Sequence, residues 1–94
     1  MMDKVEARKL LDEVLARYRA RGYAGLVALT RDLETCEVTG ASGRVYQLEI
    51  QALWDDRSQR NLRVLASIDD GGLSAFAPLT ADFVIMPDGH LLGE

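Results

Sequence analysis

Four side chains near the C-terminus have the types that bind cations or move protons. Asp69 and Asp70 stand before a pair of glycines, and Asp88 and His90 flank Gly89 in a later turn. Carboxylates with one imidazole are ligands for divalent metals and suit acid–base chemistry. The four residues therefore define a candidate ligand or metal site. Aspartate beside glycine is also typical of turns for backbone reasons, and this simpler explanation is the one we favour.

Two other residues have side chains that can act as nucleophiles. Cys36 is the one cysteine, which excludes an intramolecular disulfide and a Cys-rich metal site. It shares strand parity with Val38, which predicts a buried small hydrophobic residue rather than a nucleophile. Ser42 lies in a glycine-rich turn that lacks the G-x-S-x-G spacing of a nucleophile elbow. We therefore expect no catalytic residue and no cofactor.

The chain is organised around residues 44–69, where two alternating runs are joined by a polar loop. Alternation with a period of two marks strands that bury one face. Symmetric closure of the loop sets the apolar side chains opposite one another, and a slip by one residue would set apolar against polar. The predicted pairs are Trp54 with Leu62, Ala52 with Val64, Ile50 with Ala66, and Leu48 with Ile68.

One helix precedes this hairpin. Residues 3–21 carry apolar side chains at helical spacing, and Asp3 with Glu6 forms a capping pair. Turn signals divide the remainder into short strands, with residues 80–82 as a break. The predicted strands are residues 24–30, 33–39, 44–55, 61–69, 73–79 and 83–86. This order predicts an α+β fold: one N-terminal helix packed on an antiparallel β-meander of five to six strands, in a single domain spanning residues 1–94.

The charge distribution restricts the classes of partner. The 94 residues have a net charge of −4, and no Lys or Arg follows Arg63. Binding to a nucleic-acid backbone needs clustered cations, so we expect no nucleic-acid partner. No apolar run approaches the roughly 20 residues of a membrane-spanning helix, and the charged N-terminal segment differs from a signal peptide. We expect a cytoplasmic protein without membrane association.

Several stretches resemble a group of small uncharacterised bacterial proteins. They are Tyr46-Gln47-Leu48-Glu49-Ile50, Trp54-Asp55-Asp56, Ser67-Ile68-Asp69-Asp70-Gly71-Gly72, Phe76-Ala77-Pro78-Leu79 and Pro87-Asp88-Gly89. The resemblance covers residues 38–94 and leaves out the helix and the first predicted hairpin. It implies no named activity and no catalytic residue.

The outward face of the predicted sheet carries a second apolar row. Leu53, Leu65 and Phe76 belong to it, with Val45 farther along. The register predicts Leu65 opposite Gln51 and near Phe76, with Leu53 diagonal to it. A cluster of apolar side chains on an outer face needs an explanation. The C-terminal strands would curl over it, a second copy would cover it, or another protein would bind there.

The leading hypothesis is a non-catalytic protein-binding or regulatory module that acts as a homodimer through this outer row. The alternative is a small-ligand or divalent-metal-binding domain, enzymatic or not, that uses the acidic C-terminal turns. Neither hypothesis names a ligand, partner or biological role.

Overall fold

The structure is a computed structural model, and it describes residues 2–72 and 77–92. Within these residues the elements follow one another as α1 (Lys4–Arg19), α2 (Gly22–Val27), the 3₁₀ turn η1 (Ala28–Thr30), β1 (Glu34–Thr39), β2 (Val45–Trp54), β3 (Leu62–Asp69) and β4 (Leu79–Ile85). The strands form one antiparallel sheet in the order β1-β2-β3-β4. The predicted α+β class and antiparallel meander are confirmed. The described residues contain four strands and two helices, so the predicted five to six strands and one helix were wrong in number.

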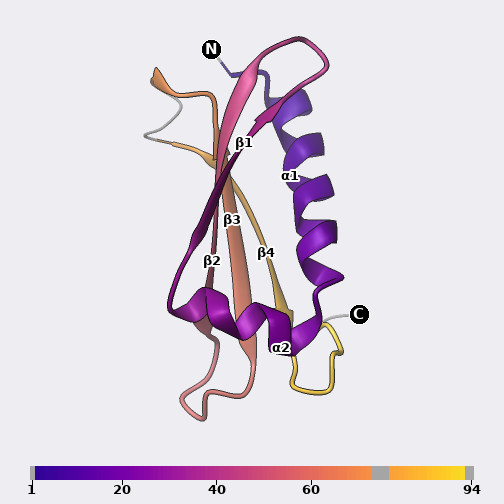
Figure 1. Ribbon diagram of the computed structural model, residues 1–94, viewed down its shortest axis with the longest axis vertical. Helices are drawn as coiled ribbons and strands as arrows, with labels where there is room; N and C mark the ends of the chain where they lie inside the picture. Colours follow the sequence, from indigo (N-terminus) through magenta and orange to yellow (C-terminus); the bar gives the residue numbers. More distant parts are fainter. Residues whose placement is uncertain (1, 73–76, 93–94) are drawn as a thin grey trace.

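Helix α1 begins where the sequence predicted. The Asp3 side chain accepts hydrogen bonds from the backbone N–H groups of Val5 and Glu6, which satisfies donors that the first turn leaves free. The helix lies along the sheet (Figure 1) and packs mainly on β3 and β4. Its buried residues are Ala7, Leu11, Val14, Leu15 and Tyr18.

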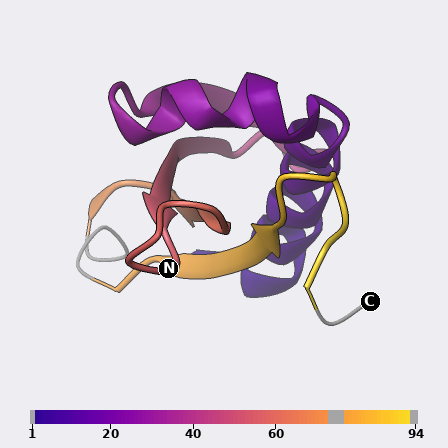
Figure 2. The same ribbon diagram turned by 90° about the horizontal axis from the view of Figure 1, so that it is seen from below.

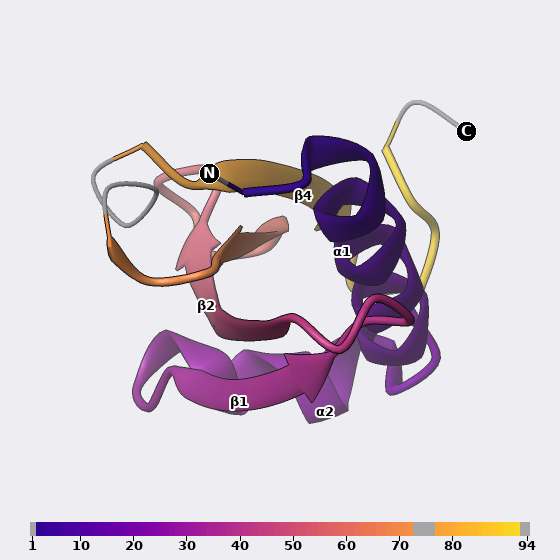
Figure 3. The same ribbon diagram turned by 90° about the horizontal axis from the view of Figure 1, so that it is seen from above.

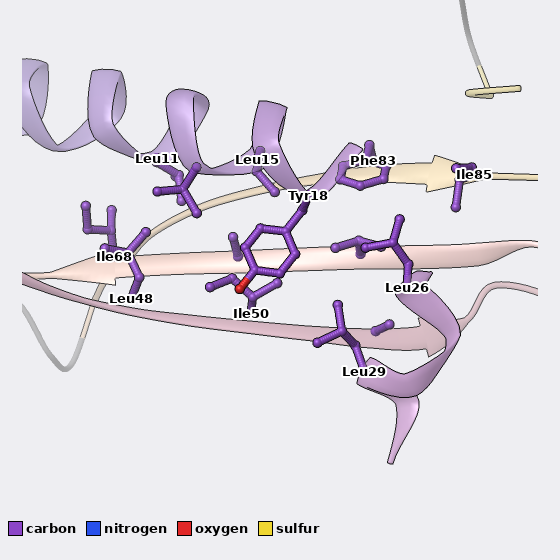
Figure 4. Close-up of a cluster of buried hydrophobic side chains, with 14 of the residues drawn as sticks. Leu11, Leu15, Tyr18, Leu26, Leu29, Leu48, Ile50, Ile68, Phe83 and Ile85 are labelled. Carbon is purple, nitrogen blue, oxygen red and sulfur yellow. The ribbon is translucent and has the colours of Figure 1, made fainter. Parts of the chain in front are cut away.

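The central hairpin has the predicted register. The four apolar pairs from Trp54–Leu62 to Leu48–Ile68 are all found between β2 and β3. Inward-facing Ile50 and Ile68 are fully buried, and Figure 4 shows Ile68 beneath Leu11 and Ile50 beneath Leu15 and Tyr18. The core is therefore one apolar layer between the sheet and the helices.

The sheet is strongly curled. Viewed from above, it bends so that β1 and β4 lie on opposite sides of the core and α1 stands beside the β4 side (Figure 3). Seen from below, α2 crosses the end of the sheet (Figure 2). Both helices pack on the inner, concave face of the sheet, so no helix covers the outer face.

Residues 24–30 form a helical segment, and the strand predicted there was wrong. Gly22, with φ of 76°, turns the chain out of α1, and α2 and η1 then bury Leu26 and Leu29. A short apolar run fits a strand or a helix equally well by period alone. Here the three-residue spacing of the two leucines decides the outcome, because it lets both side chains face the core.

The C-terminal strands are also placed differently. A single strand, β4, runs through residues 80–82, which were predicted to be a break. Leu79, Ala81, Phe83 and Ile85 face inward, and Thr80 and Asp82 face outward, so the segment alternates as a strand does. Residues 73–76 of the predicted 73–79 strand lie outside the described residues. A lone bridge between Ile85 and Leu91 follows β4.

Cys36 is exposed, and the predicted burial was wrong. The predicted parity itself is correct, because Cys36 pairs with Leu48, and Val38 pairs with Tyr46. However, β1 is the edge strand far from α1, which packs mainly on β3 and on the opposite edge strand β4. Inward parity on this strand therefore leaves Cys36 exposed and Val38 only partly buried against the core.

Candidate interaction surface

The outer face of the sheet exposes the apolar residues that the sequence singled out. Leu53 is 52% exposed, Val45 is 42% exposed, and Leu65 is half-buried. Leu65 lies opposite Gln51, as predicted, and opposite Asp82 on its other side. Phe76, the remaining member of the predicted row, lies outside the described residues. Nothing in the described part of the chain covers Leu53 or Val45, so curling of the C-terminal strands does not hide them.

An ion-pair chain crosses this face beside Leu53. Arg63, directly opposite Leu53, donates from Nε to Asp55 Oδ1 at 2.9 Å and from Nη1 to the Asp82 carboxylate. The two carboxylates raise the pKa of Arg63 further above its ordinary value. The part of the outer face around Leu53 therefore carries apolar side chains interleaved with paired charges.

The same row contains Val84, which the sequence analysis did not identify. Val84 lies on β4, pairs with Arg63 of β3 and is 7% exposed. Its carbonyl oxygen accepts a hydrogen bond from the Leu92 N–H at 2.9 Å, so the segment after β4 runs back alongside it. The apolar patch that remains available on this face is centred on Leu53 and Leu65.

The other end of the outer face, toward the turn between β1 and β2, is acidic. The sheet register sets Glu37, Gln47 and Asp69 in one row across β1, β2 and β3, and Glu49 in the next row. Glu37 accepts a hydrogen bond from Gln47 Nε2 at 3.0 Å, and Asp69 accepts one from the Gly71 N–H. We call Glu37, Glu49 and Asp69 the acidic band.

The predicted ligand residues do not come together. Asp69 ends β3, near the start of β4, because Ile68 pairs with Leu79. Asp88 and His90 follow the other end of β4, where Ile85 pairs with Leu62. The strands of this hairpin separate the two groups, since a strand rises about 3.3 Å per residue. The expectation that Asp69 and Asp70 lie near His90 was therefore wrong.

Each group is engaged locally. Asp70 pairs with Arg44 at 3.1 Å. Asp88 accepts from the His90 N–H at 3.0 Å and pairs with His90 Nδ1 at 2.9 Å, and these hydrogen bonds lower the pKa of Asp88. No three His, Cys, Asp or Glu side chains in residues 2–72 and 77–92 are grouped so as to hold a metal ion.

Asp88 also lines an open depression of about 350 Å³ between two loops. The facing loop supplies Asp56, whose carboxylate accepts from Ser58 Oγ and from the N–H groups of Arg60 and Asn61. These bonds lower the pKa of Asp56, with the Ser58 hydroxyl as the largest cause. Both carboxylates thus hold their own turns in shape.

The inward-facing carboxylate of Glu34 connects β1 to α1 and to the residue that precedes α2. Glu34 Oε1 accepts from the Tyr18 hydroxyl at 2.6 Å, and both Glu34 oxygens accept from Arg21 at 2.9 Å. The Arg21 guanidinium also lies 4.2 Å from the centre of the Tyr18 ring. Arg21, and then Tyr18, lower the pKa of Glu34 to about 2. Burial, and then the hydrogen bond to Glu34, raise the pKa of Tyr18 to about 12.

A second carboxylate ties α1 to the turn between β1 and β2. Glu6 accepts from the Ser42 N–H at 3.0 Å, from the Ser42 hydroxyl at 2.6 Å and from the Tyr46 hydroxyl at 2.9 Å. The Ser42 bonds are the main cause of the lowered pKa of Glu6. A Cβ atom at Gly40 would collide with this carboxylate. Ser42 thus has a structural role in the fold.

The sequence contained a signal for one of these ties. Glu34 has the inward parity of Cys36 and Val38, and a charged residue at an inward position requires a partner. The partner Arg21 could not be chosen, because the position of α2 was not predicted. Glu6 was expected to complete the helix cap and instead binds a turn far along the chain.

The chain matches no family model, no curated protein and no solved structure. In the part of the chain that the structure describes, no helix is long and apolar enough to cross a membrane.

Proposed function

We propose that the protein is a non-catalytic protein-binding or regulatory module that acts through the outer face of its sheet. The exposure of Leu53 beside the half-buried Leu65, on a face that no helix covers, carries this proposal. Isolated exposed apolar residues are ordinary on protein surfaces, whereas apolar residues gathered on one sheet face are typical of a contact surface. The half-buried Leu65 extends the patch from β2 to β3.

Two kinds of partner are compatible with this surface. One is a second copy of the chain, which the sequence predicted, and the other is a different protein. A domain of 94 residues gains stability from association, which favours an oligomer. Sedimentation equilibrium over a wide concentration range separates the two, because a homodimer dissociates on dilution and a monomer does not change.

Site-specific crosslinking in the cells that produce the protein tests the proposal itself. A photoreactive benzoylphenylalanine in place of Leu53 is expected to give discrete covalent adducts. The matched control carries the same group in place of Val5, which is 82% exposed on α1, the helix that packs on the inner face. Adducts that are absent at position 53, or identical at both positions, would show that the outer face is not a contact surface.

A further inference from the structure

The charge on the outer face identifies the class of partner that fits it. The four strands contain one basic residue, Arg63, and it is already paired with Asp55 and Asp82. Within the described residues, no carboxylate of the acidic band is in an ion pair, and Glu37 and Glu49 are exposed. The apolar patch therefore adjoins a surface with uncompensated negative charge.

This charge disfavours the contact of two identical outer faces. In a twofold dimer both copies use the same face, so two surfaces of the same negative charge would be brought together. Like charges brought together at an interface oppose association, and the effect is strong within a Debye length of about 8–10 Å. A second copy is therefore a poor fit to the whole face.

We infer that the outer face docks a cationic segment of a different protein, anchored by apolar side chains on Leu53 and Leu65. This inference rests on the proposed function and specifies its partner. The apolar patch supplies buried area, and the acidic band supplies complementary charge that guides encounter and orientation. Lys or Arg side chains of the segment would face Glu49 and Glu37.

The spacing on the sheet defines the length of that segment. Leu53 and Glu49 lie on the same face of β2, four residues apart, which corresponds to about 13 Å. A helix covers that distance with about nine residues, and an extended chain covers it with about four. The segment therefore carries its apolar anchor and its first cation at one of these two separations.

A synthetic amphipathic peptide of leucine and lysine is a suitable probe, with its leucine–glutamate counterpart as the control ligand. Fluorescence anisotropy with the full chain is expected to show binding of the lysine peptide that weakens with salt. The paired change Glu37→Gln with Glu49→Gln should weaken it about tenfold and reduce its salt dependence. Leu53→Ser should weaken binding but keep the salt dependence.

The matched charge control is Asp12→Asn with Glu13→Gln, which removes two exposed carboxylates of α1, the helix on the inner face of the sheet. It should leave the affinity within about twofold. The inference would be overturned if the two double variants lost equal affinity for the lysine peptide, or if the glutamate peptide bound as tightly as the lysine peptide. If instead the chain forms a dimer that Leu53→Asp dissociates, the partner class is wrong and the proposed function stands. Absence of both peptide binding and crosslinking at position 53 would reject both.

Discussion

Strand β2 shows how differently the two faces of the sheet are used. Its inward residues Leu48 and Ile50 are at most 2% exposed, whereas outward Val45 and Leu53 are 42% and 52% exposed. The inward residues belong to one continuous apolar core, and the outward residues are separated by acidic and amide side chains. The same alternating strand therefore gives one face its stability and leaves the other free to serve contacts.

The largest expected effect is on the inner face. Ile50→Ala should lower the free energy of unfolding by about 2–5 kcal/mol, because it removes buried methyl groups and leaves a cavity. Urea unfolding followed by circular dichroism measures this change. A loss below about 0.5 kcal/mol would mean that Ile50 is not in a packed core.

An intermediate loss of stability is expected at Glu34, the charged residue that faces inward on β1. Glu34→Gln should cost about 1 kcal/mol at pH 7, since both partners of the Glu34–Arg21 ion pair are more than a third exposed and are screened by solvent. Glu37→Gln, on the outward side of the same strand, is the control and should have almost no effect on stability.

Acid titration sharpens this comparison. Because the pKa of Glu34 falls from 4.5 to about 2 on folding, its contribution is present above pH 4.5 and is lost as the pH falls toward 2. Glu34→Gln should therefore lose less stability than the original chain over that interval. Parallel pH profiles of the two proteins would contradict this assignment.

The smallest effect is expected on the outer face. Leu53→Ala should change the free energy of unfolding by no more than about 0.5 kcal/mol, because half of the side chain already faces solvent. The same urea measurement tests it. A loss comparable to that of Ile50→Ala would show that the outer face contributes to folding as the inner face does.

The parts of the fold that depend on local alternation were predictable. A register slip would have exposed Leu48 or Ile68, so the pairing of β2 with β3 followed from the sequence. Residues 24–30 were not predictable by the same rule, because a short apolar run has no decisive period. The break assigned at residues 80–82 hid Asp82 as an outward strand residue, and with it the ion pair to Arg63.

The candidate surface was predictable in part, for a related reason. Parity placed Leu53 and Leu65 on the outer face, and the register placed Leu65 opposite Gln51. The acidic band requires the pairing of three strands at once, because Glu37 and Asp69 are far apart in the sequence and meet only through Gln47. The ties made by Glu6 and Glu34 depend on helix positions that strand alternation does not specify.

The contact between Glu6 and the turn at Gly40 links two distant positions genetically. The backbone at Gly40 has no positive φ, so its own conformation does not require glycine. The Glu6 carboxylate occupies the space that a side chain at position 40 would need. Gly40→Ala should therefore displace the Glu6 carboxylate from Ser42, so it should be harmful in the original chain and nearly neutral beside Glu6→Ala, because the two changes remove the same contacts.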